Sequence, residues 1–246
     1  MTDALFFAGN VDVPIGGVVH LDGPEGRHAA TVRRIRVGET VLLADMFGSA
    51  IRGATQCVGP DFIDVRVDEQ LRESSRAHRW VAVQALAKNG RDEQAVEAMT
   101  ELGVDEVVAW QASRSVVEWR GAEKQAKSLA KWASTAREAA KQSRRFSVPG
   151  IDLVTTVKLC GRISSAAQAF VLHESATEFL DAQTMVPSGE VMFVVGPEGG
   201  ISPEELATFE AAGAKPVLVA DHVLRTSTAG VVALAQLQAM AHGVSA

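Results

Sequence analysis

The hydrophobic pattern of the chain changes near residue 73. Before that point the apolar runs are short and β-type, and turns with Gly or Gly-Pro separate them: 18–21, 40–46 and 62–67. This spacing predicts a small β-rich barrel or sandwich. The polar, basic segment 72–79 has the composition of a linker. We therefore predict one domain over residues 1–72 and a second over residues 73–246.

After residue 73, apolar runs typical of buried strands alternate with amphipathic helical patterns. The predicted strands cover 80–87, 105–110, 169–174, 190–196 and 215–220, and the predicted helices cover 91–102, 121–142, 203–212 and 229–241. This alternation indicates βα units and a mostly parallel sheet, so the fold class is α/β. Gly103 and Gly213 fit the position just after a helix. Ser202, Pro203 and Glu205 form the sequence signature of a capped helix start.

The stretch VGPEGGISPEE, residues 195–205, places three glycines between a buried strand and that helix start. Ligands of open α/β sheets bind at the carboxyl ends of strands, which is where this loop lies. Glycine permits positive φ and lets a ligand approach the backbone, although a tight turn without a ligand is the alternative. The loop contains neither GxxxxGK[ST] nor GxGxxG. We therefore expect a ligand read by backbone groups, such as an adenine ring, rather than a phosphate.

A second loop, DHVLRTSTAG over residues 221–230, leads into the last predicted helix. Arg225 stands next to three hydroxyl residues, Thr226, Ser227 and Thr228. At least one hydroxyl is expected to cap the helix. Arg225 in a short loop beside a glycine-rich loop is suited to hold an anion, a carbonyl group or a phosphate.

Several ordered blocks resemble the SPOUT class of RNA methyltransferases, and within it the family that methylates uridine N3 in 16S ribosomal RNA. HAATVRRIRVGETVLLADMFG (28–48) is similar to the family's N-terminal segment, and ALAKNGRDEQAVEAMTELGV (85–104) to its Lys–ELGV block. REAAKQSRRFSVP (137–149) is similar to a third block, and VGPEGG and VLRTSTA to the two cofactor loops. The resemblance implies an N-terminal PUA-like β-barrel that helps to grip RNA and a C-terminal domain with a trefoil knot. It also implies bound S-adenosylmethionine and a homodimer.

The resemblance also implies the cofactor-binding residues. They are Leu172, His173, Gly196, Pro197, Glu198, Gly199, Gly200, Val219, Ala220, Val223, Leu224, Thr226, Ser227, Thr228 and Ala229. A purely structural role is the alternative for His173. The chain departs from the family pattern at four positions, where Ala98, Ala220, His222 and Ser227 replace Lys, Gly, Arg and Glu. Ser227 can cap a helix but cannot act as a carboxylate base.

The charge pattern fits an RNA substrate, either free 16S ribosomal RNA or the assembled small subunit. The net charge of −6 excludes a uniformly basic chain, yet residues 114–145 carry nine basic side chains against three acidic ones. Such a stripe suits backbone phosphates, with a solvated helix face as the alternative. The expected RNA-binding residues are Arg27, His28, Arg33, Arg34, Arg36, Arg114, Arg137, Lys141, Arg144 and Arg145. Because Tyr is absent and aromatics are 5% of the chain, extensive base stacking is not expected.

Methylation of uridine N3 requires that the imide lose its proton and that the negative charge on O2 and O4 be stabilised. Arg225 is the candidate clamp for these oxygens, and Glu198 the candidate base or orienting group. The alternative for Glu198 is that it braces the amides of its own loop. Two other functions stay open: a non-catalytic RNA-binding SPOUT relic, and a nucleotide-dependent α/β enzyme.

The remaining composition narrows the setting. Cys57 and Cys160 are isolated, which favours a reducing, cytoplasmic location. The start of the sequence lacks a basic n-region, so no signal peptide is expected, and no apolar run is long enough to span a membrane. The six histidines show neither HxxxH nor HExxH spacing, so no metal site is expected.

Overall fold

The computed structural model describes residues 3–181 and 185–244. It divides into two compact units. Unit 1 comprises Met1–Ser75 and Ala140–Val148, and unit 2 comprises Arg76–Ala139 and Pro149–Ala246. The boundary expected between residues 72 and 73 lies three residues before the division at Ser75. Nothing in the composition of the sequence indicates that residues 140–148 belong to unit 1.

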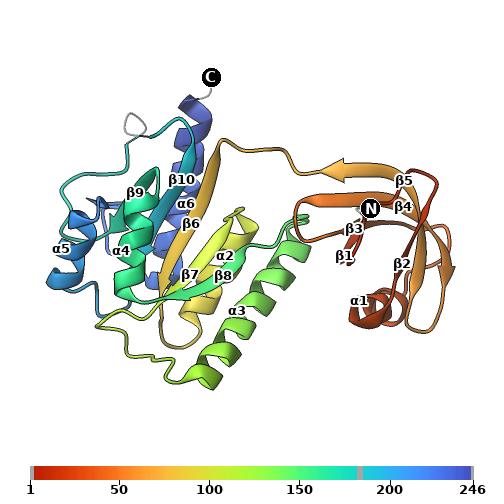
Figure 1. The fold of residues 1–246 in the computed structure, drawn as a ribbon, viewed down its shortest axis with the longest axis horizontal. Coiled ribbons are helices and arrows are strands. Elements are labelled where there is room, and N and C mark those ends of the chain that lie inside the picture. The colour runs from red at the N-terminus through yellow and green to blue at the C-terminus, as the bar shows by residue number, and fades with distance from the viewer. Residues whose placement is uncertain (1–2, 182–184, 245–246) are drawn as a thin grey trace. The chain divides into compact units, whose positions relative to one another are not determined.

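Unit 1 is built on one five-stranded sheet with the order β1-β3-β4-β5-β2 (Figure 1). Its strands are β1 (Ala4–Phe7), β2 (Val18–Leu21), β3 (Thr40–Ala44), β4 (Ser49–Val58) and β5 (Ile63–Arg72). β1 and β3 are parallel, and the other pairs are antiparallel. A short helix α1 (Gly23–Arg27) and a π-helical turn η1 (His28–Val32) follow β2. The predicted β-rich domain is confirmed, but in the described residues the strand pairing ends at β1 and β2 and does not close into a barrel.

The segment 140–148 is held to unit 1 by Glu73. The carboxylate of Glu73 accepts hydrogen bonds from the amides of Phe146 (2.6 Å) and Ser147 (2.9 Å) and from the Ser147 hydroxyl (2.7 Å). Although burial raises the pKa of Glu73, these hydrogen bonds and the charge of Arg145 outweigh it and lower the pKa below its usual value. The ionised carboxylate therefore pins the segment to the start of the inter-unit connection.

One residue predicted to bind RNA, Lys141, does not lie on an exposed face. Its ammonium group lies 3.1 Å from Glu25, and only 6% of its side chain is exposed. A lysine in this position is buried and paired within unit 1, so its prediction as an RNA contact on an exposed stripe is wrong. The helical spacing that placed it beside Arg137 and Arg144 could not show that residues 140–148 pack on the β-sheet.

Unit 2 is built on a six-stranded sheet with the order β11-β9-β10-β6-β7-β8. The strands are β6 (His78–Ala85), β7 (Glu106–Trp110), β8 (Gly150–Val154), β9 (Gln168–Leu172), β10 (Gly189–Val195) and β11 (Lys215–Val217). Every pairing in the described part of this sheet is parallel, which confirms the predicted α/β class. The trefoil knot implied by the resemblance stays a prediction.

Helices cover both faces of this sheet (Figure 1). α4 (Thr156–Ser165) and α5 (Pro203–Ala211) bury Leu159, Ile163 and Phe209 against one face. α2 (Arg91–Glu101) and α6 (Thr226–Val244) pack on each other and on β6 at the other face. α3 (Ala122–Gln142) is the longest helix of the described chain. No helix in the described ranges combines the length and apolarity needed to cross a membrane.

The predicted signals at the helix ends are confirmed. Ser202 accepts a hydrogen bond from the Glu205 amide, and the Glu205 carboxylate accepts one from the Ser202 amide, which together complete the capping box. Gly103 and Gly213 have φ values of +92° and +103° just after α2 and α5. Only glycine adopts this conformation without a steric penalty, so both helices end where the sequence indicates.

Candidate functional site

A cleft of about 420 Å³ opens at the carboxyl ends of β9, β10 and β11. This size is typical of small-molecule sites. From β6 the chain adds β7 and then β8 on one side of the sheet. It then crosses to the other side of β6, where it forms β9, β10 and β11, with β10 next to β6. The cleft therefore lies next to the point where the strand order reverses, which is where ligands of open α/β sheets bind.

Most of the predicted ligand-binding residues line this cleft. They are Leu172, His173, Gly196, Pro197, Glu198, Gly200, Val219, Ala220, Val223, Leu224, Arg225, Thr226 and Ala229. Three predicted residues are outside the lining: Gly199, Ser227 and Thr228. The lining also contains residues that the sequence reasoning missed: Arg91, Glu174, Val195, Ile201, Val217, Leu218, Asp221 and His222. Most of these adjoin predicted positions, whereas Arg91 is the first residue of α2, after β6, and could be found only from the strand order.

The three glycines of the GPEGG loop are required by the protein itself. A Cβ atom on Gly196 would lie 2.8 Å from Ile201, and one on Gly199 would lie 3.0 Å from the Arg114 carbonyl oxygen. Gly200 has a φ of +72°. The prediction that Gly199 is bare because a ligand approaches it is therefore corrected: its free side faces the backbone of Arg114.

Thr226 joins the two loops. Its hydroxyl donates to the Gly196 carbonyl oxygen (2.9 Å) and accepts from the Gln84 side-chain amide (2.8 Å). Thr226 and Gln84 are both buried. Thr226 thus fixes the start of α6 against the GPEGG loop, and the Arg225 carbonyl oxygen accepts the amides of Thr228 and Ala229 in the first turn of α6.

Glu198 connects two βα loops rather than bracing its own. Its carboxylate accepts a hydrogen bond from the Lys88 amide (3.0 Å) and lies 3.5 Å from the guanidinium of Arg91. Lys88 belongs to the loop that follows β6 and Arg91 is the first residue of α2, across the strand-order reversal from β10. The alternative that Glu198 holds the amides of its own loop is therefore wrong, and the observed contacts suit a group that orients the neighbouring loop.

Arg225 differs from Arg91 in its surroundings. Arg225 is exposed at the cleft, and within the described chain no hydrogen bond or ion pair engages its guanidinium, whereas Arg91 is paired with Glu198. A guanidinium presents five donors in a planar fork. Arg225 is thus the lining arginine with its donors available to a ligand.

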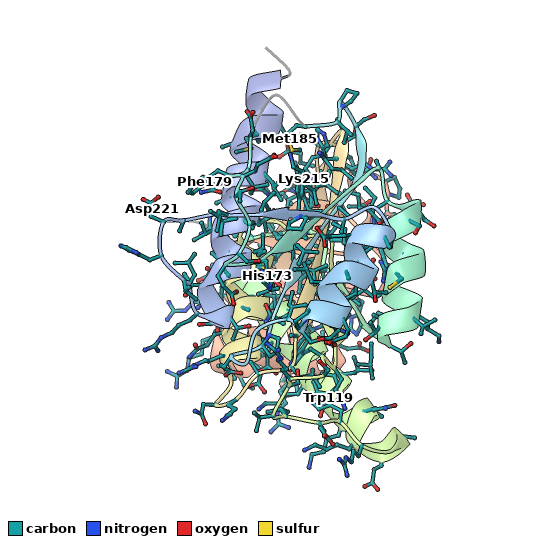
Figure 2. All side chains as sticks on the ribbon, turned by 90° about the vertical axis from the view of Figure 1, so that its left-hand side faces the viewer. Trp119, His173, Phe179, Met185, Lys215 and Asp221 are labelled. Carbon is teal, nitrogen blue, oxygen red and sulfur yellow. The ribbon has the colours of Figure 1, made fainter. Side chains whose placement is uncertain are left out.

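His173 has local partners. Its Nδ1 accepts the Ser175 amide at 3.2 Å and lies 2.8 Å from the Ser175 hydroxyl. An Nδ1 atom that accepts an amide hydrogen bond carries no proton, which leaves Nε2 as the N–H of the ring. This contact stabilises the turn after β9, as the structural alternative expects. Figure 2 shows His173 close to the sheet and Asp221 on a loop that stands away from it.

Arg114 lies beside the site. Its side chain donates to the Gly199 carbonyl oxygen at 3.3 Å. Glu205 holds the adjacent Ser113 through its amide (2.7 Å) and its hydroxyl (2.8 Å). The capping-box glutamate of α5 therefore also fixes the loop that carries Arg114 against the GPEGG loop.

The other predicted RNA-binding residues are spread over both units. Arg27, Arg33, Arg34 and Arg36 are exposed on unit 1, and Arg144 is exposed on its 140–148 segment. His28 is half-buried and meets Phe6 edge-on with ring centroids 5.9 Å apart. Arg137 and Arg145 are half-buried. Within the described residues, no cluster of three or more His, Cys, Asp or Glu side chains could hold a metal ion.

Comparison with known proteins identifies the family. The model of the RNA methyltransferase domain matches residues 73–238. The chain is 43% identical over 224 residues to Ribosomal RNA small subunit methyltransferase E of Mycobacterium bovis, covering 89% of this chain and 85% of the relative. It is 27% identical to the protein of the same name from Bacillus subtilis, with 88% of each chain covered.

Solved structures agree with this match. A methyltransferase from Legionella pneumophila in complex with the bound cofactor SAM superimposes with a TM-score of 0.85 at 25% identity, covering 97% of this chain and 98% of that chain. Ribosomal RNA small subunit methyltransferase E from Neisseria gonorrhoeae, bound to S-adenosyl methionine, has the same fold with a TM-score of 0.82 at 23% identity over 97% and 98% of the two chains. The resemblance noted in the sequence is confirmed, and the chain belongs to the RNA methyltransferase domain family.

Proposed function

We propose that this protein transfers a methyl group from S-adenosylmethionine to N3 of a uridine in the 16S ribosomal RNA of the small subunit. The observation that carries the proposal is the cleft between the GPEGG and VLRTSTA loops, in a chain whose family acts on RNA. The curated relatives named small subunit methyltransferases and the SAM-bound structural neighbour support it. The reaction takes place in the cytoplasm, on free RNA or on the assembled subunit.

The cleft fits the chemistry of S-adenosylmethionine. Its walls include the apolar side chains of Leu172, Val217 and Leu224, which suit the adenine ring. The carboxylates of Glu174 and Asp221 also line it and complement the positive charges of the sulfonium and ammonium groups. These residues would hold the cofactor, which supplies an activated methyl group when bound.

The protein's own residues must prepare the uridine. The N3 proton would pass to solvent water, and the bound cofactor would then supply its methyl group to N3, with S-adenosylhomocysteine as the leaving group. The free donors of Arg225 hold the charge that develops on O2 and O4. Glu198 keeps the loop at Lys88 and the start of α2 at Arg91 in place beside the cleft, acting as an orienting group.

The reaction can be tested in cells. Ribosomal RNA from a strain that lacks this protein is expected to lose 3-methyluridine, measured by mass spectrometry of nucleosides, and the modification should return with the wild-type gene. Retention of 3-methyluridine would favour a non-catalytic RNA-binding protein. Calorimetry with S-adenosylhomocysteine against ATP and NAD tests the nucleotide-dependent alternative, which predicts that only the latter ligands bind.

We also propose a homodimer formed through α6. Leu234 and Leu237 are buried within unit 2, but Val231 and Met240 are only half-buried and Ala235 is exposed. A helix that is apolar nearly all round needs a second surface to cover it. Light scattering at micromolar concentration is expected to give twice the monomer mass. Ala235→Arg should produce a monomer, whereas Ala207→Arg on the exposed side of α5 should not; a wild-type monomer would refute the dimer.

A further inference from the structure

Phe47 is the most exposed of the large hydrophobic side chains in the described part of the chain, with a relative exposure of 87%. It lies in the turn between β3 and β4 of unit 1. Single exposed apolar residues are common on protein surfaces, so exposure alone assigns no role. The turn that presents this ring and the side chains near it are more specific features.

The turn holds Phe47 outward. The Asp45 carboxylate accepts hydrogen bonds from the amides of Phe47 (2.7 Å) and Ser49 (3.0 Å), closing the turn from inside. Met46 and Gly48 on either side have φ values of +70° and +104°. A left-handed conformation at a methionine is strained and persists only where its surroundings fix it. The aromatic ring is therefore presented by a defined backbone.

A second segment fixes the turn from outside. Phe47 forms an antiparallel bridge with Ser147, and the Gly48 amide donates to the Phe146 carbonyl oxygen at 3.4 Å. Ser147 is itself held by Glu73 through its amide and its hydroxyl. Both carboxylates near the turn, Asp45 and Glu73, are thus directed at backbone amides and the Ser147 hydroxyl.

Two arginines, Arg145 and Arg72, lie near the turn. Arg145 donates to the Ser147 hydroxyl at 3.2 Å, so its guanidinium contacts the residue that bridges to Phe47. Arg72 pairs with Ser49 across β4 and β5, and it lines one shallow hollow together with Phe47. The rest of that hollow is mainly polar and includes Asn10, Asp12 and Gln70.

We propose that Phe47 is a stacking platform for one unpaired base of the RNA substrate, with Arg145 and Arg72 placed to contact the neighbouring phosphates. An exposed aromatic ring with polar groups and arginines nearby suits a nucleotide, because a base covers the ring while its phosphates need cations. A protein partner would instead need a wider apolar surface around the ring. The inference rests on the proposed RNA substrate. A single base contact is compatible with the low aromatic content, which argues only against extensive base stacking.

Binding to naked 16S ribosomal RNA tests the proposal. Filter binding at one fixed salt concentration is expected to give a Kd roughly 5- to 140-fold weaker for Phe47→Ala, because stacking on an aromatic side chain contributes about 1–3 kcal/mol per base. Phe47→Trp should bind as the wild type does, and Phe47→Leu should resemble Phe47→Ala because it keeps apolar area without a π-face. Val157→Ala, at a side chain that is 83% exposed on α4, is the matched control and should bind normally.

Fluorescence provides a direct readout of the ring. The four native tryptophans, Trp80, Trp110, Trp119 and Trp132, are at most 5% exposed, so Phe47→Trp adds an accessible indole to a shielded background. RNA should quench this added emission and protect it from acrylamide, while the wild-type signal changes little.

The possible results distinguish failure of the stacking role of Phe47 from failure of the proposed methyltransferase function. Normal RNA binding by Phe47→Ala, or by Phe47→Leu, would overturn the stacking role while leaving methyl transfer intact. Weaker binding of Phe47→Ala to assembled small subunits alone, with naked RNA bound normally, would assign the ring to a protein partner and also overturn it. A wild-type protein that binds neither RNA form would refute the proposed function, and the stacking role with it.

Discussion

Arg225→Ala is expected to slow methyl transfer by roughly 100- to 1,000-fold at saturating RNA, while S-adenosylhomocysteine binding changes little. Losses of this size are typical when one donor to a developing oxyanion is removed. The reason is geometric: Arg225 lines the cleft with its guanidinium unpaired, and its carbonyl oxygen accepts hydrogen bonds in the first turn of α6. Truncation of the side chain keeps those backbone bonds, so the cofactor loop should retain its shape.

Two measurements and two further variants show how the result should be interpreted. Single-turnover methylation gives the rate of the chemical step, and calorimetry gives cofactor affinity. Arg225→Lys should restore little, because a point charge does not reproduce the planar fork. Glu198→Gln should keep most of the rate, since a side-chain amide oxygen can still accept from Lys88, whereas loss of a general base would lower the rate by roughly 100- to 10,000-fold. A wild-type rate for Arg225→Ala would show that Arg225 only binds or supports the loop.

The parts of the structure that could be predicted from the sequence depend on short-range patterns. The run before Gly196 and the capping signature at Ser202–Glu205 place a strand end next to a helix start, and this locates the GPEGG loop without knowledge of the whole fold. Alternation of such runs with helical patterns predicts the parallel sheet of unit 2. The cleft follows because the carboxyl ends of parallel strands meet at one edge.

Other elements lack a clear local pattern. β4 contains Arg52, Gly53 and Gln56 and shows register shifts against β5, so its sequence has no clean alternation. β8 is a five-residue strand at the sheet edge, and its sequence GIDLV contains one small and one charged residue among three apolar ones. Such strands form because a neighbour supplies hydrogen bonds, which a single-chain pattern does not reveal.

The site residues that were missed depend on contacts between distant loops. Arg91 reaches the cleft because β6 and β10 are adjacent in the sheet, although the two strands are more than a hundred residues apart in the chain. Gly199 was assigned to the ligand, but the residue that requires its small size is Arg114. A glycine pattern indicates that another group comes close to the backbone, but it does not show whether that group is a ligand or another part of the protein.

Lys141→Ala is expected to destabilise unit 1 by about 3–5 kcal/mol, because it leaves the Glu25 carboxylate buried without its ammonium partner. The side chains of Lys141 and Glu25 are only 6% and 14% exposed, so water cannot replace the lost contact easily. Urea unfolding followed by circular dichroism measures the change. Arg36→Ala, an exposed arginine of the same unit, is the control and should unfold as the wild type does.

A double variant separates the ion pair from the space that it fills. Lys141→Met combined with Glu25→Gln removes both charges at similar volume, and buried pairs replaced in this way commonly lose little or no stability. Most of the loss caused by Lys141→Ala should therefore be recovered. The salt dependence of RNA binding should be unchanged in the double variant, since a lysine directed at Glu25 neutralises no phosphate. If Lys141→Ala instead unfolds normally and flattens that salt dependence, Lys141 faces the RNA, as its helical spacing alone suggested.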